Sequence, residues 1–328
     1  MATSRTEPGP AASRPRRTAA RCLAGLALAA PTAVLGCRLA GVDGVTPLPQ
    51  LLAFLPYLLV PAAAALALAL LASWRAGLAW AVAVLFGLGA VLPSYDRAAP
   101  PPTAAPVATV RVLTANLKLG AATDALAGTL RREHPDLVFV QECDPACGRL
   151  LSTEEMTARY PHRIVTAVPG AEGSAILSRH PLRPAGEVPA TLAMPTAETV
   201  IEGVPVALQL AHPLPPIPGM VDSWRRELAA LHSAATALDG PAIMAGDFNA
   251  TRDHAAFRDI LDTGLRDATT TIGLGHTPSW PAGTPLAGAQ IDHILIRGPF
   301  RPASGEFVDL PGSDHRALLV EMELFAQG

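Results

Sequence analysis

Hydrophobic residues dominate the first third of the chain. Within residues 18–96 they form three apolar stretches, at about 19–41, 48–72 and 76–94. About 20 apolar residues suffice for a helix to cross the hydrocarbon core of a bilayer, so the pattern predicts about three transmembrane helices. A cleaved signal peptide, with Arg16 and Arg17 in its basic region, is the alternative interpretation of the first stretch.

Polar segments flank this region. Residues 1–17 are polar and basic, which predicts a disordered tail, and the proline-rich residues 97–106 predict a semi-rigid linker. Cytoplasmic loops of membrane proteins carry an excess of arginine and lysine. Six of the eight arginines in residues 1–106 lie on one side of the predicted spans: Arg5, Arg14, Arg16, Arg17, Arg21 and Arg75. We therefore expect a cytoplasmic N-terminus and an extracytoplasmic location for everything after residue 95.

The hydrophobic pattern changes from residue 107 onward. Short strand-like runs alternate with helical ones: "TVRVLTANL" alternates as a half-buried strand, "DLVFVQE" is a continuous apolar strand, and residues 222–238 form the clearest amphipathic helix. Such a mixture over residues 107–328 fits an α/β domain in which two mixed sheets pack face to face with helices outside them.

Polar residues follow several of these strands. A polar residue at the end of a strand can project into a shared cleft while the strand holds it rigidly. The residues are Asn116 in "LTANL", Glu142 in "VFVQE", Asp247 and Asn249 in "GDFNA", Asp292 in "IDHIL", and Asp314 and His315 in "GSDHR". Carboxylates, amides and an imidazole together predict a site for a hard divalent cation and a phosphate.

The order of these motifs resembles that of the endonuclease/exonuclease/phosphatase superfamily, the metal-dependent phosphoesterases related to deoxyribonuclease I and neutral sphingomyelinase. The resemblance covers roughly residues 107–328 and implies a four-layer α/β sandwich. It also implies Mg²⁺, or Mn²⁺ in its place, as cofactor, with one or two ions. By this resemblance Glu142 is the principal metal carboxylate, Asn116 lies beside the metal, and Asp314 binds it directly or through a neighbour.

The same resemblance implies the catalytic roles. Asp247 orients or deprotonates the attacking water, and Asn249 donates to a phosphate oxygen. His212 at the end of "QLAH" stabilises the transition-state oxyanion. Asp292 fixes the tautomer of His315, and either His315 or Asp247 is the general base.

The charge of the chain restricts its partners. Of the net charge of −3, residues 1–106 carry +5 (8 basic, 3 acidic) and residues 107–328 carry −8 (17 basic, 25 acidic). Nucleic acid is a poorly matched partner for an acidic domain, because DNA binding depends on Lys and Arg neutralising phosphates. We expect the membrane and a phosphate-bearing, lipid-linked substrate as partners, and the sequence indicates no protein partner.

The combination of a multi-span anchor with this domain is similar to the bacterial cell-envelope proteins associated with teicoplanin antibiotic resistance. That similarity implies a phosphohydrolase acting on a carrier-lipid pyrophosphate such as undecaprenyl pyrophosphate. The alternatives are an extracellular nuclease, a sphingomyelinase or phospholipase C-like phosphodiesterase, and a non-catalytic scaffold. The spacing of Cys143 and Cys147 allows a disulfide without requiring one.

Overall fold

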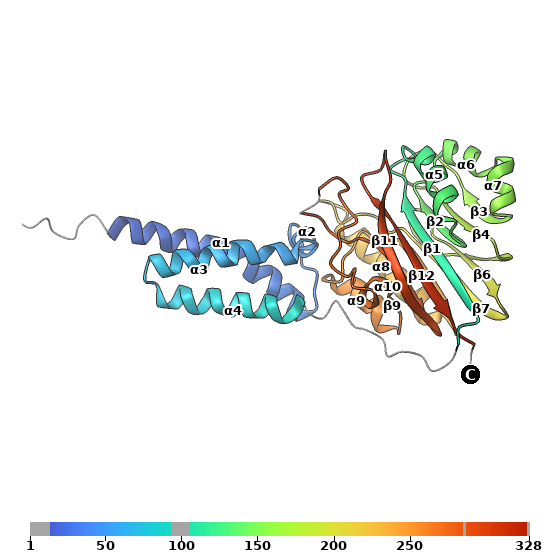
Figure 1. Cartoon of the computed structure of the whole chain (residues 1–328). Coiled ribbons are helices and arrows are strands. Elements are labelled where there is room, and N and C mark those ends of the chain that lie inside the picture. Colours follow the sequence, from blue (N-terminus) through green and yellow to red (C-terminus); the bar gives the residue numbers. More distant parts are fainter. Residues whose placement is uncertain (1–13, 93–104, 285–286, 327–328) are drawn as a thin grey trace, which may run out of the picture. The chain divides into compact units, whose positions relative to one another are not determined.

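The computed structural model describes residues 14–92, 105–284 and 287–326 (Figure 1). These residues form two compact units: residues 14–40 with 54–92, and residues 41–53 with the described residues from 105 onward. Residues 1–13 of the predicted tail and most of the predicted linker 97–106 lie outside the described residues. Residues 14–17, expected in the tail, belong to the first helix.

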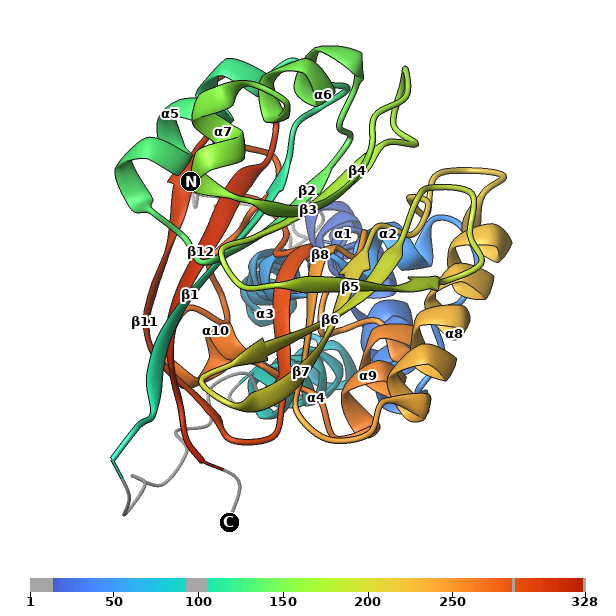
Figure 2. The same cartoon turned by 90° about the vertical axis from the view of Figure 1, so that its right-hand side faces the viewer.

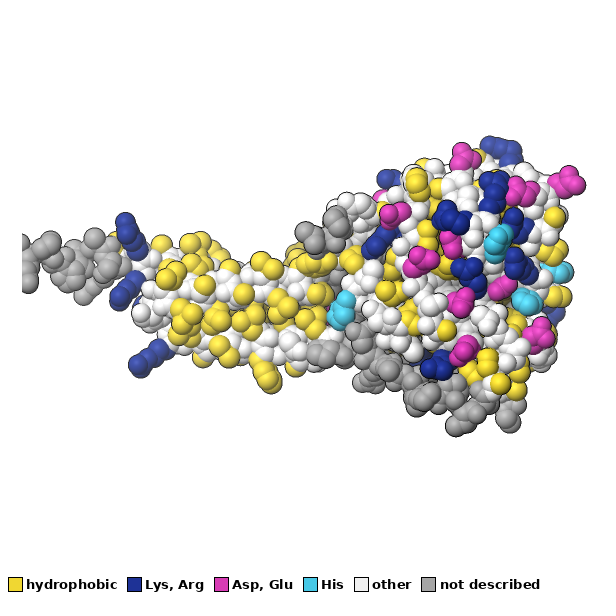
Figure 3. Space-filling view, viewed as in Figure 1, with side chains coloured by type: hydrophobic (Ala, Val, Ile, Leu, Met, Phe, Trp, Pro, Cys, Tyr) yellow, Lys and Arg dark blue, Asp and Glu magenta, His cyan; other side chains and the backbone are white. Residues whose placement is uncertain are grey.

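The first unit consists of helices. These are α1 (Arg14–Ala40), the short η2 (Leu55–Leu58), α3 (Leu59–Leu71) and α4 (Arg75–Val91). Figure 3 shows hydrophobic side chains along its surface, and Leu26, Leu71 and Phe86 are 73%, 76% and 78% exposed. A surface helix of a water-soluble protein carries polar residues on its outer face. This unit carries leucine and phenylalanine there, as a helix facing lipid does.

The prediction of about three membrane spans is not confirmed. Among the described residues, only α1 is long and apolar enough to cross a bilayer, over Pro15–Ala40, and the apolar helices Leu55–Leu71 and Arg75–Val91 are shorter. The stretch expected at 48–72 divides into α2 (Leu48–Leu52) and the helix that begins at Leu55. Pro49 and Pro56 lie in the first turns of these two helices, where proline's missing amide N–H leaves no hydrogen bond unmade.

The second unit contains two six-stranded mixed sheets. The first has the order β11-β12-β1-β2-β4-β3, and the second has the order β5-β6-β7-β8-β10-β9. The strands are β1 (Ala108–Asn116), β2 (Leu137–Gln141), β3 (His162–Thr166), β4 (Ser174–Ser178), β5 (Leu182–Glu187), β6 (Pro195–Ile201), β7 (Val204–Ala211), β8 (Ala242–Asp247), β9 (Arg266–Asp267), β10 (Asp292–Arg297), β11 (Phe300–Asp309) and β12 (Arg316–Leu324). Only β1–β2 and β7–β8 are parallel pairs among them.

Helices cover the outer face of each sheet (Figure 2). The first sheet packs against α5 (Thr123–Glu133), α6 (Pro145–Leu151) and α7 (Glu154–Arg159), and the second against α8 (Val221–Ala237) and α9 (Ala255–Asp262). The short α10 (Ala268–Thr271) follows β9. Between the sheets lies a core that includes Phe139, Ile243 and Leu318. The two packed mixed sheets flanked by helices confirm the sandwich predicted from the sequence.

Strand pairing brings the ends of the central strands together. In the first sheet Asn116 pairs with Gln141, so Glu142 follows directly beside the end of β1. In the second sheet Asp247 and Asp292 are direct partners across β8 and β10. Continuous burial along β2 and β8 explains their unbroken apolar sequences, because both faces of these strands are covered.

Candidate active site

Asn116 and Glu142 lie at the end of the first sheet. The Asn116 Nδ2 donates to Glu142 Oε1 at 3.0 Å, and the Leu119 amide donates to Oε2 at 2.6 Å. Glu142 has a φ of 58°, in the left-handed region that few non-glycine residues adopt. The backbone therefore turns sharply at the strand end and directs this carboxylate toward Asn116.

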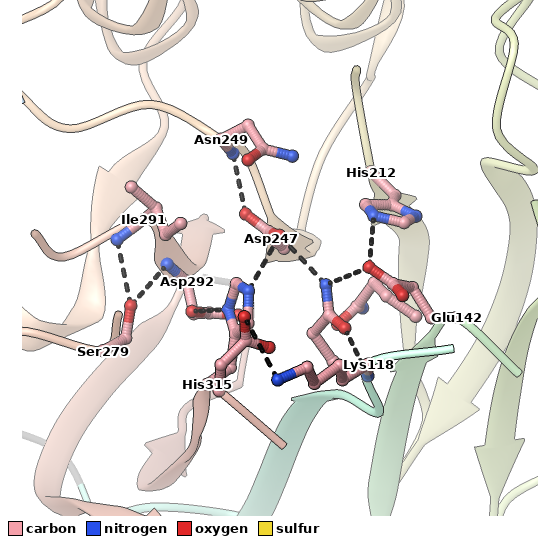
Figure 4. A network of polar contacts seen from close by, with 12 residues as sticks. Lys118, Glu142, His212, Asp247, Asn249, Ser279, Ile291, Asp292 and His315 are labelled. Atoms are coloured by element: carbon pink, nitrogen blue, oxygen red, sulfur yellow. Dashed lines mark hydrogen bonds and ion pairs between the residues drawn. The ribbon is translucent and has the colours of Figure 1, made fainter. Parts of the chain in front are cut away.

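Asp247 and Asn249 lie at the end of the second sheet (Figure 4). Asp247 Oδ1 accepts the Asn249 amide at 2.8 Å, and Asn249 Nδ2 donates to the Pro213 carbonyl at 3.0 Å. Gly246 allows this arrangement, since a Cβ there would lie 1.9 Å from the Ala211 carbonyl oxygen. The sequence predicts that the Asn249 side chain contacts a phosphate. In the structure its hydrogen bond to Pro213 anchors the turn to the residue after His212.

A hydrogen bond between side chains joins the two sheets at this point. Asn116 Nδ2 donates to Asp247 Oδ2 at 3.1 Å, across 131 residues of sequence. Both residues are 1% exposed. Residues predicted from separate motifs therefore meet in one place.

His315 lies between two carboxylates. Its Nδ1 is 2.9 Å from Asp292 Oδ2, and its Nε2 is 3.7 Å from Asp247 Oδ2. Ser313 fixes this turn, because its hydroxyl donates to the Asn116 carbonyl and accepts the His315 amide. The expected pairing of Asp292 with His315 is present in the structure.

The electrostatics of the cluster follow from its burial. Burial raises the pKa of Asp247 to about 7, with Asp292 adding to the shift against the lowering effect of His315. Burial alone lowers the pKa of His315, but Asp292 and Asp247 raise it overall, to about 10. A protonated His315 thus neutralises part of the negative charge of the two aspartates.

His212 is a buried neutral imidazole. It is 2% exposed, and burial lowers its pKa to about 3, with further lowering by His315. Its Nε2 lies 3.9 Å from Glu142 Oε1, and its Nδ1 has no hydrogen-bond partner among the described residues. The structure therefore places His212 beside the predicted metal carboxylate, as Figure 4 shows.

Asp314 lies at the edge of this group. Its carboxylate is 38% exposed and lies 3.9 Å from the ammonium of Lys118. His293, which follows Asp292, lies on the other face of β10, where its ring contacts Asp267 Oδ2 at 2.8 Å and the Ala250 carbonyl at 3.0 Å. Although burial raises the pKa of Asp267, His293 lowers it overall, and the contact joins β10 to β9.

The donor set fits a divalent metal ion. Ligand atoms of Asp247, Asp292 and His315 lie within 4.8 Å of one another, and Asp292 Oδ1 is a buried oxygen without a hydrogen-bond partner among the described residues. An unpartnered buried carboxylate oxygen is costly, and a cation removes that cost. Glu142 provides a further carboxylate, and Asn116 connects it to this cluster by donating hydrogen bonds to both Glu142 and Asp247. The ligands predicted from the sequence were Glu142, Asn116 and Asp314, whereas the tightest cluster consists of residues predicted to be catalytic.

Two contributors to the site were missed in the sequence. The Ser279 hydroxyl accepts the amides of Ile291 and Asp292 at 3.0 and 3.1 Å and so holds the start of β10. Lys118, the only lysine in the chain, faces Asp314. Its rarity was a signal that could have identified it, whereas nothing in "TPSWP" marks Ser279.

Cys143 and Cys147 form a disulfide directly after Glu142. Both residues are fully buried. The bond ties the end of β2 to α6, whose first turn is capped by Asp144. The sequence had left this pairing open.

Strand ends that gather acidic residues, amides and two histidines between two packed sheets define a phosphoesterase type of site. A family model for the endonuclease/exonuclease/phosphatase family matches residues 113–315, and the chain belongs to this family. Members of the family are typically hydrolases of phosphodiesters or phosphate esters.

Solved structures share the fold. TDP2 from D. rerio, humanized by 14 mutations, has 17% identity and a TM-score of 0.55 over 66% of this chain and 99% of its own. An endonuclease/exonuclease/phosphatase from Beutenbergia cavernae has 20% identity and a TM-score of 0.55 over 66% and 72%. An AP endonuclease from Archaeoglobus fulgidus has 17% identity and a TM-score of 0.51 over 64% and 98%. No curated protein sequence matches the chain.

Proposed function

We propose that this protein is a membrane-anchored, extracytoplasmic phosphohydrolase that cleaves a lipid-linked phosphate or pyrophosphate, with undecaprenyl pyrophosphate as the leading substrate. The observation that carries the catalytic part is the buried Asp292–His315–Asp247 arrangement, with Glu142 joined to it through Asn116. An imidazole held between two carboxylates suits proton transfer, which simple binding does not require.

The apolar helices support the lipid-linked substrate. The first unit presents leucine and phenylalanine on its surface, and α1 is long enough to span a bilayer. A phosphatase tethered to the membrane meets lipid-borne phosphates at high local concentration. The net charge of −8 on residues 107–328 disfavours DNA as the substrate.

The proposed reaction is an in-line attack of water on phosphorus. The water loses its proton to the Asp247 carboxylate, beside the protonated His315, as its oxygen bonds to phosphorus, and the leaving oxygen takes a proton from solvent water as its bond to phosphorus breaks. His212 and Asn249 donate hydrogen bonds to the phosphate oxygens on which charge develops. A divalent ion such as Mg²⁺, held by Glu142 and the aspartates, would polarise the phosphate when bound.

Hydrolysis by the full-length protein in detergent tests this proposal. We expect Mg²⁺-dependent phosphate release from undecaprenyl pyrophosphate, with no comparable turnover of sphingomyelin or DNA, and loss of activity in EDTA. His315→Ala should lower kcat by about 10²- to 10⁴-fold, the usual contribution of a general acid or base. His180→Ala, between β4 and β5, is the matched control and should be unaffected. Turnover of DNA or sphingomyelin instead would redirect the assignment, and full activity in His315→Ala would refute the proposed centre.

A further inference from the structure

The segment that follows α1 belongs to the same compact unit as the sheets. Residues 41–53 belong to the second unit. Asp43 is 6% exposed, and its two carboxylate oxygens accept the backbone amides of Ala255 at 2.6 Å and Ala256 at 3.1 Å. These amides begin α9, whose own N-cap residue, His254, makes no capping hydrogen bond with its side chain. Asp43 therefore caps this helix from a position more than 200 residues earlier in the chain.

A second contact connects the loop to His254 itself. His254 is fully buried, and its Nδ1 accepts the Thr251 amide at 2.9 Å. Nδ1 is thus the unprotonated nitrogen, and Nε2, which carries the proton, donates to the Pro49 carbonyl at 2.8 Å. Burial lowers the pKa of His254, which agrees with this neutral form. Gln50 also donates to the Pro216 carbonyl, in the segment that follows His212.

These contacts continue to the active-site turn. The His254 ring packs edge-on against Trp224 with ring centroids 5.1 Å apart, and the Trp224 indole N–H donates to the Asn249 carbonyl at 3.1 Å. Asn249 is the residue whose backbone amide binds Asp247. It has a φ of 48°, a conformation that an unsupported loop would leave readily. Support for this turn therefore extends from Asn249 through Trp224 and His254 to Pro49.

We propose that residues 41–53 support the active site from outside it. In this scheme Asp43 and Pro49 hold the Asp247–Asn249 turn in position through His254 and Trp224. Asp43 and His254 are positioning residues in this scheme, because neither contacts the reacting groups. The catalytic role of the turn rests on the proposed function, whereas the structural coupling does not. One consequence is that the catalytic domain starting at residue 107 is incomplete without the segment that follows α1.

Hydrogen–deuterium exchange of the full-length protein in detergent tests the coupling directly. In Asp43→Ala, we expect amide exchange in residues 249–256 to rise by roughly 2- to 30-fold, the range expected from loss of a helix cap. Exchange in residues 113–142 should not change. Asp43→Asn retains one acceptor oxygen and should give a smaller increase.

Kinetics on undecaprenyl pyrophosphate with Mg²⁺ provide the second measurement. Asp43→Ala should lower kcat several-fold and leave KM nearly unchanged, because Asn249 is expected to act mainly in the transition state. Asp43→Asn should restore part of kcat. The matched control is Thr153→Ala, which removes the Thr153 side-chain cap of α7 and should lower the melting temperature without changing kcat.

The two measurements separate the inference from the proposed function. Faster exchange at residues 249–256 would support the coupling, whether or not the wild type hydrolyses the substrate. If the wild type hydrolyses neither this substrate nor any phosphate ester, the proposed function is refuted but the coupling is not. Exchange at residues 249–256 equal to that of the wild type would overturn the coupling. A behaviour of Asp43→Ala like that of Thr153→Ala, with lower stability but unchanged kcat, would overturn the positioning role.

Discussion

Individual backbone conformations direct the site's side chains. Glu142 and Asn249 both have positive φ, at 58° and 48°, although neither is glycine. Glu142 follows β2 in the first sheet, and Asn249 follows β8 in the second. The Leu119 amide donates to the Glu142 carboxylate, and the Trp224 indole N–H donates to the Asn249 carbonyl. Strained residues persist only where the surroundings determine them, so these two turns are fixed before any ligand binds.

Gly246 offers a test of this fixed geometry at the scale of one residue. In Gly246→Ala the new Cβ would lie 1.9 Å from the Ala211 carbonyl oxygen, so β7 and β8 must separate. We expect unfolding free energy to fall by about 1–3 kcal/mol, as in an overpacked core, and activity to be lost with it. Gly128→Ala is the control: nothing lies within 4 Å of its Cβ in α5, so stability should rise by about 0.5–1 kcal/mol. Chemical denaturation measures both, and an unchanged Gly246→Ala would contradict the tight approach.

The connection between β2 and α6 is the element that carries Glu142. The Cys143–Cys147 disulfide closes this short connection next to the predicted metal carboxylate. In Cys143→Ala/Cys147→Ala we expect stability to fall by about 2 kcal/mol from the lost loop closure. The Mg²⁺ concentration for half-maximal activity should rise, because Glu142 loses a covalently fixed neighbour.

The free cysteines provide the control for that variant. Cys22 and Cys37 lie in α1 and are not bonded to each other. Cys22→Ala/Cys37→Ala should leave both the unfolding of the catalytic domain and the Mg²⁺ titration unchanged. An equal melting temperature for the disulfide-free variant and the wild type would show that the bond contributes nothing to this connection.

Hydrophobic periodicity could predict those helices and strands whose own sequences carry a clear pattern of apolar and polar residues. β1, β2 and α8 were expected from their hydrophobic patterns, and the polar residues at the strand ends identified the site. β5 was missed because its sequence, "LRPAGE", is exposed almost throughout and carries no alternation. Ser279 was missed because its role depends on backbone amides of a distant strand, which no local pattern records.

The loop at residues 41–53 shows the same limit more sharply. Its last residues, "LPQLLA", read as the start of an apolar span because they are hydrophobic. They belong instead to the same compact unit as the sheets, and Leu52 is fully buried. A hydrophobic run indicates that a segment is buried, but only the tertiary contacts decide whether lipid or protein buries it.

At the scale of the whole molecule, the charge, the surface and the cysteines all bear on the proposed extracytoplasmic location. Arginines lie at the start of α1 and of α4, and the exposed faces of the helices are apolar. A disulfide is typical of proteins outside the cytosol. We propose that the arginine-bearing ends lie in the cytoplasm and the catalytic domain lies outside it, as the positive-inside bias predicts.

Protease treatment of intact cells that express the protein tests this orientation. We expect the protein to stay with membranes in alkaline carbonate, because α1 presents an apolar surface of bilayer length. Added protease should digest the domain of residues 107–328 without cell lysis. Changing Arg16, Arg17 and Arg21 to glutamate should reduce the digested fraction, since the orienting charge is reversed while the length of α1 is kept. Complete protection in intact cells, with digestion only after lysis, would place the domain in the cytoplasm and remove the lipid-linked substrates of the outer surface from consideration.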